Sequence, residues 1–229
     1  MKISFLGFDL LEGKVKYNDE RLKALADKFS PKKVTPFFVE FIKGDFEKSD
    51  GIVLSREKTL DLFILDMDKL DTRSQRTESA QEKELIKKCM AKLEEEVPLC
   101  DVVFTPEESA IIKMIAPYSL KPTIIEENEP EASDIVEKLL QKAETVFFYT
   151  AGEKEVRAWP VDKGSDIVSC AGKIHSDLAR GFIKADIVSF DNFIGEHNMQ
   201  AAKTKGLVAL VGKDYIIKDG DIIEIRFNV

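Results

Sequence analysis

The segment after the first apolar stretch carries the glycines and the lysine of a phosphate-binding loop, but in an altered pattern. Residues 7–15 read GFDLLEGKV. In a loop of the form G-x-x-x-x-G-K-[ST], amides surround the phosphates, the lysine contacts them and the last hydroxyl binds Mg²⁺. Here the loop is one residue longer, and Val15 replaces the hydroxyl residue. Asp9 and Glu12 would repel a phosphate. We therefore predict that Lys14 belongs to a hairpin turn.

Two polar residues, Asn128 and Glu131, follow a predicted strand. An amide and a carboxylate at this spacing can hydrogen-bond the edge of a base. The alternative is that Asn128 caps the helix that Pro130 opens, a common use of asparagine beside an N-terminal proline. We favour the capping role. Without a phosphate site, base contacts alone would bind an adenine nucleotide only weakly.

No group of histidine, cysteine and carboxylate residues has the spacing of a zinc site, so we expect no metal. Cys89, Cys100 and Cys170 form no C-x-x-C pair and are expected to be free thiols. The sequence also lacks a Ser-His-Asp elbow and a dinucleotide-binding fingerprint. We therefore assign no catalytic residue.

A weak basic bias marks the middle of the carboxyl-terminal part. The candidate contacts for a partner, either RNA or protein, are Lys173, His175, Arg180 and Lys184. The alternative for the three cations is an ordinary solvated surface, which we favour. For His175 it is a local capping hydrogen bond, which we favour.

Composition narrows the classes of protein. The chain has 229 residues, with 34 basic and 42 acidic side chains and a net charge of −8. This balance gives no DNA-binding signature and does not favour an anionic membrane surface. No apolar run reaches the roughly 18 to 20 residues that span a bilayer, and no signal-peptide pattern opens the chain. We expect a cytoplasmic protein.

The first 149 residues alternate between strand and helix patterns, which predicts an α/β sandwich around a largely parallel sheet. They contain 30 of the 42 acidic residues. A capping box with proline at the first helical position predicts a helix start at residues 105–108. The predicted strands are residues 3–6, 34–42, 60–65, 101–104, 122–125 and 145–149, and the other predicted helices include residues 19–29 and 130–143.

After Gly152 the pattern changes to short strands with one helical segment, typical of a small α+β domain on a mixed sheet. The predicted strands are residues 156–161, 183–190, 207–211 and 221–227, and the helical segment is residues 167–178. We therefore predict two domains, residues 1–149 and 150–229.

Several segments of the second domain carry a family resemblance: TAGEKEVRAW at 150–159, AGKIHSD at 171–177, RGFIKA at 180–185 and RFNV at 226–229. They resemble the TGS domain that closes the YchF, or Obg-like, ATPases. This resemblance implies a ubiquitin-like β-grasp fold. The first domain resembles the nucleotide-binding, G-domain-like part of the same family more faintly, through residues 19–22, 31–34 and 39–41 and through Asn128 and Glu131.

The resemblance assigns roles to positions that this chain has changed. In the family, the Asn-x-x-Glu pair reads adenine, and an Asp-x-x-Gly motif after the strand at 39–41 organises Mg²⁺. Lys43 occupies the position of that aspartate, so the metal ligand is absent unless Asp45 replaces it in a shifted register, which we do not favour. Together with the altered loop at 7–15, this implies a degenerate nucleotide site.

Three hypotheses follow. The favoured one is a truncated, non-catalytic relative of the family that binds a ribosomal, RNA or regulatory protein partner through its TGS-like domain. The second is an ATP- or GTP-hydrolysing enzyme with a site rebuilt from Lys14, Asp45, Asn128 and Glu131. The third keeps adenine binding without turnover and without Mg²⁺.

Overall fold

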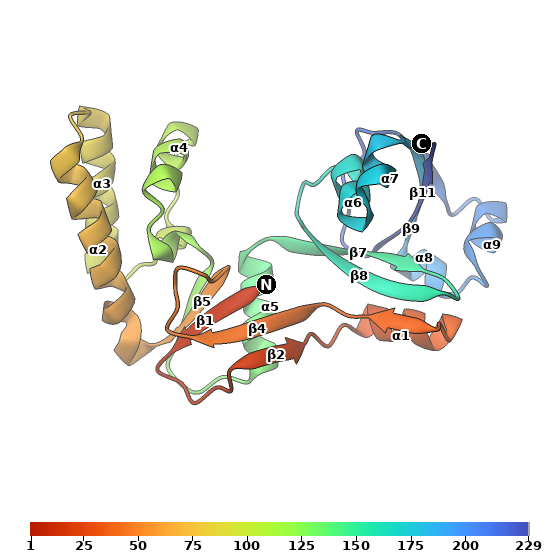
Figure 1. Ribbon diagram of the computed structural model, residues 1–229, viewed down its shortest axis with the longest axis horizontal. Helices are drawn as coiled ribbons and strands as arrows, with labels where there is room; N and C mark the ends of the chain where they lie inside the picture. The colour runs from red at the N-terminus through yellow and green to blue at the C-terminus, as the bar shows by residue number, and fades with distance from the viewer. Residues whose placement is uncertain (229) are drawn as a thin grey trace. The chain divides into compact units, whose positions relative to one another are not determined.

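The computed structural model describes residues 1–228, so Val229, the last residue of the terminal family-like segment, lies outside the described part. Strands and helices alternate along the chain (Figure 1). The strands are β1 (Lys2–Leu6), β2 (Gly13–Lys16), β3 (Lys33–Thr35), β4 (Phe38–Lys43), β5 (Gly51–Ser55), β6 (Thr123–Glu126), β7 (Thr145–Ala151), β8 (Glu155–Asp162), β9 (Phe182–Ser189), β10 (Ala209–Val211) and β11 (Asp221–Phe227). The α-helices are α1 (Glu20–Phe29), α2 (Thr59–Arg76), α3 (Ala80–Glu94), α4 (Pro106–Ile115), α5 (Ala132–Lys142), α6 (Ile167–Ile174), α7 (Ser176–Arg180), α8 (Phe190–Ile194) and α9 (Met199–Thr204), and the 3-10 helices are η1 (Arg56–Lys58), η2 (Leu99–Asp101) and η3 (Tyr118–Leu120).

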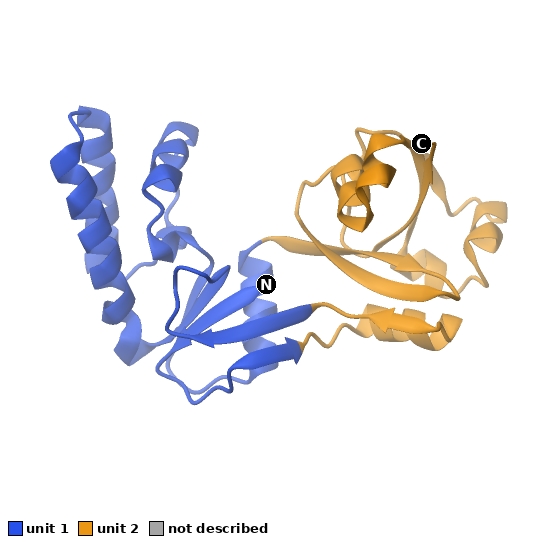
Figure 2. Ribbon diagram, in the orientation of Figure 1, with its two compact units in different colours: residues 1–15, 38–143 blue, residues 16–37, 144–229 orange. Residues whose placement is uncertain are grey.

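The first compact unit comprises residues 1–15 and 38–143 (Figure 2). Its sheet has the strand order β2-β4-β1-β5-β6, and β1 pairs in parallel with both β4 and β5, as β5 does with β6. Ile52 and Leu54 of β5 form one apolar cluster with buried side chains of α2, α3 and α4. The predicted α/β class is confirmed. The carboxyl ends of the parallel strands meet at one edge, where such sheets commonly bind ligands.

Two predicted strands of this unit are wrong. The apolar run at residues 60–65 lies within helix α2, where Leu62 and Phe63 are buried and Ile64 is 54% exposed. A short apolar run fits both the strand and the helix period, and here the helix period decides. The buried strand that follows β4 is β5 instead. Residues 101–104 also form no strand, because η2 occupies the start of that segment.

The predicted start of α4 is confirmed in its atomic detail. Thr105 Oγ1 accepts a hydrogen bond from the Glu108 amide at 3.2 Å, and Glu108 Oε2 accepts one from the Thr105 amide at 2.9 Å. Pro106 occupies the first turn. This reciprocal capping pairs amides that a helix start leaves without partners.

The second compact unit comprises residues 16–37 and 144–229, of which all but the last are described. Its mixed sheet has the order β10-β9-β11-β7-β8-β3. Strands β7 and β8 form an antiparallel hairpin, β11 runs parallel to β7, and β9 runs antiparallel to β11. Ile167, Cys170 and Ala171 of α6 pack in one cluster with Phe148 and Trp159 of the hairpin.

The compact units divide the chain differently from the predicted boundary after Tyr149. Strand β7 and the segment 16–37 both belong to the second unit. The Tyr149 hydroxyl donates to Asp19 Oδ2 at 2.8 Å, and β3 pairs in parallel with β8. Helix α1 also places Arg21 Nη1 2.6 Å from Asp219 Oδ2. These contacts join positions more than a hundred residues apart, which local sequence patterns do not reveal.

Within residues 1–228, no helix is long and apolar enough to cross a membrane.

Candidate functional site

The loop that follows β1 leads into a strand and not into a helix. Gly13 and Lys14 begin strand β2, so the prediction of a hairpin turn at Lys14 is wrong. The first α-helix of the described chain begins only at Glu20. A phosphate-binding loop derives much of its affinity from the amides and dipole of a helix that starts at the lysine. At Gly13 and Lys14 this helix N-terminus is absent.

The same loop packs closely against the end of β5. Gly7 has φ +89°, and a Cβ built on it would lie only 1.9 Å from Ser55 Oγ and 2.9 Å from Lys58 Cγ. Glycine is required here for both its backbone conformation and this close approach. On the side toward β5, protein atoms therefore fill the space next to the loop.

Two glutamates make hydrogen bonds at this loop. The Asp9 amide donates to Glu129 Oε1 at 2.9 Å, and Glu12 Oε2 accepts from the Lys43 amide at 3.3 Å. An anion cradle needs such amides to point at the ligand. Here one amide of the loop already serves a glutamate, which would also repel a phosphate.

Asn128 and Glu131 both lie exposed between β6 and α5, at the carboxyl edge of the parallel sheet. The prediction that Asn128 caps this helix is wrong: α5 begins at Ala132, and its N-cap is Glu131, whose side chain makes no capping hydrogen bond. Pro130 therefore precedes the cap instead of opening the helix. No hydrogen bond of the Asn128 side chain occurs within residues 1–228, so its amide remains available to a ligand.

Lys14 lies elsewhere in the first unit. It is exposed on β2 and lines a hollow of about 930 Å³ together with Met1, Phe38 and Asp50, which mark the amino ends of β1, β4 and β5. Asn128 follows the carboxyl end of β6, and these four strands are parallel. The structure therefore does not bring Lys14 together with Asn128 and Glu131. The prediction that these three residues form one site is therefore wrong, because the strands place Lys14 at one end of the sheet and Asn128 and Glu131 at the other.

Asp45 forms hydrogen bonds with the neighbouring Lys48 and does not belong to a group of metal-ligating side chains among the described residues. Its carboxylate accepts hydrogen bonds from the Lys48 amide at 3.1 Å and from Lys48 Nζ at 2.8 Å. These hydrogen bonds hold the pKa of Asp45 below its ordinary value. Among the described residues, no three His, Cys, Asp or Glu side chains gather as ligands for a metal ion.

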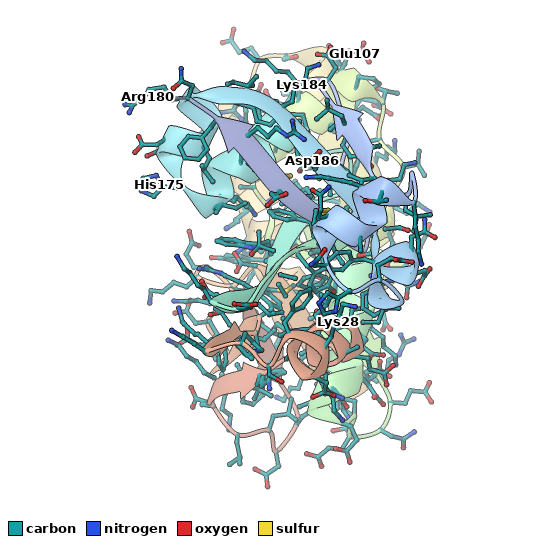
Figure 3. All side chains as sticks on the ribbon, turned by 90° about the vertical axis from the view of Figure 1, so that its right-hand side faces the viewer. Lys28, Glu107, His175, Arg180, Lys184 and Asp186 are labelled. Atoms are coloured by element: carbon teal, nitrogen blue, oxygen red, sulfur yellow. The ribbon has the colours of Figure 1, made fainter. Side chains whose placement is uncertain are left out.

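In the second unit, the predicted capping role of His175 is confirmed. Its Nδ1 accepts from the Asp177 amide at 3.2 Å at the start of α7. Arg180 Nη2 lies 2.8 Å from Asp177 Oδ1, and Lys173 Nζ donates to the Pro160 carbonyl at 2.7 Å. Lys184 is exposed on β9. Figure 3 shows His175 and Arg180 on one side of this unit and Lys184 apart from them. These residues thus form a dispersed surface and not a pocket.

The sequence analysis missed a buried ionic group in the same unit. Asp186 is 3% exposed, and its carboxylate receives two hydrogen bonds from Arg226, at 2.8 and 2.9 Å, while Lys203 Nζ lies 3.0 Å from Oδ2. Burial raises the pKa of Asp186, but the hydrogen bonds from the two cations outweigh it and lower the pKa overall. An aspartate inside the apolar run IKADIVSF was the available signal. The group joins β9, β11 and α9.

The sequence similarity to known proteins lies mainly in this second unit. The family model YchF-GTPase_C, described as "Protein of unknown function (DUF933)", matches residues 145–228. Over 82 residues the chain is 50% identical to the "Ribosome-binding ATPase YchF" of Mycoplasma genitalium and equally to that of Bacillus subtilis. It is 41% identical over 105 residues to "Obg-like ATPase 1" of Danio rerio. The chain is a relative of the YchF family.

The similarity to YchF proteins in sequence is partial. The match covers 36% of this chain and 22% of the Mycoplasma genitalium protein, and 45% and 26% for the Danio rerio protein. The chain therefore spans about a quarter or less of the length of these curated relatives. The matched region runs from β7 to the end of β11 and contains Lys173, His175, Arg180 and Lys184.

The likeness in fold extends further. A solved structure, "Structure of the Schizosaccharomyces pombe YchF GTPase", superposes with a TM-score of 0.81. It covers 99% of this chain and 97% of that one, at 16% sequence identity. At this identity the comparison establishes a shared fold that extends over both units.

Proposed function

We propose that this chain is a non-catalytic YchF-family protein that binds a partner, with the ribosome as the leading candidate. The proposal takes the partner from the relatives, which are named ribosome-binding, and transfers it through the segment of high identity. In this proposal the first unit is a degenerate G-domain that serves as a scaffold. The second unit is a TGS-like β-grasp domain that makes the contact, and the protein acts in the cytoplasm.

The assignment of a β-grasp to the second unit is supported by its topology. A hairpin of β7 and β8 is followed by helix α6, and the chain then returns through β9 and β11 to place β11 beside β7. Parallel pairing of the first and last strands with a helix across one face is the arrangement that the sequence resemblance implies. The segment 16–37 adds β3 and α1 to this core.

The proposed loss of catalysis rests on one observation: the loop after β1 enters a strand, Ser55 lies against its Gly7, and Glu129 accepts a hydrogen bond from its Asp9 amide. Phosphoryl transfer depends on electrostatic stabilisation by lysine, metal and loop amides. In this proposal none of these converges on the carboxyl edge of the sheet.

An assay of phosphate release tests this part. The full chain with Mg²⁺ and either ATP or GTP should release phosphate no faster than a protein-free blank. Lys14→Ala should leave that baseline unchanged, because Lys14 lies at the opposite end of the strands. Mg²⁺-dependent turnover that disappears in Lys14→Ala would overturn the proposal of a scaffold.

The partner contact is tested by co-sedimentation with purified ribosomes. Reversing Lys173, Arg180 and Lys184 to glutamate should weaken binding at least tenfold, since interfacial charges act on association. A matched control reverses three exposed lysines of the first unit, Lys83, Lys87 and Lys113, with the same change in net charge. If the control weakens binding equally, the effect is one of total charge and the assignment to the second unit fails.

A second function, adenine-ligand binding without turnover, is favoured by one observation: the Asn128 amide is exposed and unengaged at the carboxyl edge of the sheet. Adenine nucleotides should then raise the thermal midpoint more than guanine nucleotides do. Asn128→Ala should abolish this difference, and Asn18→Ala, another exposed asparagine, should retain it. Equal shifts for both bases would exclude this function.

A further inference from the structure

The sheet of the second unit opens between two of its central strands. Strand β7 pairs with β8 as far as Ala151, and β11 pairs with β9 as far as Phe227. Within residues 1–228, however, the parallel pairing of β11 with β7 covers only Asp221–Phe148 and Ile222–Tyr149. Figure 1 shows β11 rising away from the hairpin of β7 and β8 beyond this point. The last five residues of β11, 223–227, therefore have a sheet neighbour on one side only.

A cavity of about 610 Å³ lies where the strands separate. Ile174 and Leu178, on the helices that cover one face, line it together with Ile225 of β11. Met199 of α9 and Glu224 line it too. Neighbouring residues of a strand point to opposite faces, so Glu224 and Ile225 lie on different sides of the sheet. Residues of both faces therefore line this cavity along the edge of β11 that β7 leaves unpaired, and we call it the slot.

The slot combines an unpaired strand edge with apolar walls. The side chain of Phe227 at its rim is 48% exposed, although it is a large aromatic residue. Buried backbone groups almost always find hydrogen-bond partners, and an open strand edge offers them to another chain. An extended peptide satisfies both features, because its backbone pairs with β11 while alternate side chains enter the apolar wall.

The charges of the residues that line the slot favour a peptide over a nucleic acid as its ligand. The lining contains three carboxylates, Glu153, Glu155 and Glu224, against one amino group, Lys154. Glu155 pairs with Lys33 at 3.0 Å and Glu224 with Lys203 at 3.2 Å, so the slot carries no excess of cations. Binding of RNA depends on neutralising phosphates with lysine and arginine. These charges favour an occupant with polar or basic residues facing Glu224.

We propose that this slot binds an extended peptide segment of a partner protein by strand addition to residues 223–227 of β11. The segment alternates apolar residues, directed toward Ile174 and Leu178, with polar or basic residues on the other face. Five residues of β11 correspond to a paired length of about 16 Å. Lys173, Arg180 and Lys184 do not line the slot, so variants at these residues and variants of the slot test the ribosome contact and this inference separately.

Titration of the isotope-labelled full chain with a blocked hexapeptide of alternating valine and lysine tests the site by NMR. Amide shifts and slower hydrogen exchange should appear at residues 223–227 and 150–151. A peptide of the same composition with its valines and lysines in two blocks should bind more weakly. Methylation of alternate peptide nitrogens should weaken binding about tenfold or more, because it removes the donors that pair with β11.

Two matched variants locate the effect. Phe227→Ser changes the rim of the slot, and Leu210→Ser changes an equally exposed residue, 50% against 48%, on β10 of the same sheet. Only Phe227→Ser should weaken the peptide. The proposal is overturned if no shift occurs at millimolar peptide, if the methylated peptide binds equally well, or if Leu210→Ser has the same effect. It is also overturned if a uridine oligonucleotide shifts residues 223–227 and the peptide does not.

Discussion

Helix α1 offers a direct test of how the chain divides, because it precedes most of the first unit in sequence but is packed in the second. Leu25 of α1 is fully buried. Truncating a buried leucine to alanine costs about 2–5 kcal/mol through lost transfer energy and the cavity left behind. A loss of about 3 kcal/mol is a large fraction of ordinary domain stability. Leu25→Ala should therefore destabilise the second unit substantially.

Site-resolved hydrogen exchange measures this effect in each unit separately. A loss of about 3 kcal/mol corresponds to roughly 150-fold faster exchange of amides that open with the unit. In Leu25→Ala this acceleration should appear in β7, β9 and β11, while β1 and β5 keep their protection. Leu62→Ala, at a fully buried leucine of α2, is the matched control and should accelerate exchange in β1 and β5 instead.

Two outcomes would refute the reasoning. If Leu25→Ala accelerated exchange in β1 and β5 as strongly as in β9, the two units would unfold as one. If it accelerated β1 alone, helix α1 would belong to the first unit, as the sequence-based boundary implied. In the second case, a fragment of residues 150–229 should fold as an independent domain.

Further predictions concern buried polar groups. Ser4 Oγ is buried and has no hydrogen-bond partner among residues 1–228, whereas Ser119 Oγ, equally buried, accepts from the Leu99 amide at 3.2 Å. In chemical denaturation, Ser4→Ala should raise the free energy of unfolding by about 1 kcal/mol, and Ser119→Ala should lower it by about 1–3 kcal/mol. Burial raises the pKa of Asp66 against the opposing amides of Ser119 and Tyr118. A raised folded-state pKa favours folding below the unfolded value and is lost as pH rises through the folded one, so wild type should gain stability relative to Asp66→Asn on going from about pH 7 to about pH 4. Arg226→Gln should raise the pKa of Asp186, as followed by carboxyl NMR, because burial then acts against fewer hydrogen bonds.

Local chemistry was predictable wherever neighbouring residues decide the structure. The capping box at Thr105 and the capping role of His175 both depend on partners two or three residues away. Periodicity located α1 for the same reason, since it buries Leu22 and Leu25 on one face. The run at residues 60–65 failed because six apolar-rich residues satisfy either period, and tertiary burial of Leu62 and Phe63 selected the helix.

Features that depend on distant contacts could not be derived in this way. The membership of residues 16–37 in the second unit rests on pairings such as Asp19 with Tyr149, which no local pattern encodes. The slot between β7 and β11 likewise arises because two strands, each regular by itself, stop pairing after Ile222. The sequence of residues 221–227 predicted a strand. It could not predict the residue at which the neighbouring strand β7 stops pairing with it.

The residues that match nucleotide-binding motifs show why the difference between local and distant contacts matters for predicting function. Lys14 and Asn128 were grouped because each matches part of a nucleotide-binding pattern in the correct sequence order. The fold keeps that sequence order and still separates the two residues, because β2 lies at the edge of the sheet beside β4 and Lys14 lies near the amino ends of β1, β4 and β5. The order of motifs along the sequence therefore predicts a site only when the element that connects them is present. In this chain that element, a helix directly after β1, is absent from the described residues. In this chain the residues of high identity and the open sheet edge both lie in the second unit, and partner binding is best sought there.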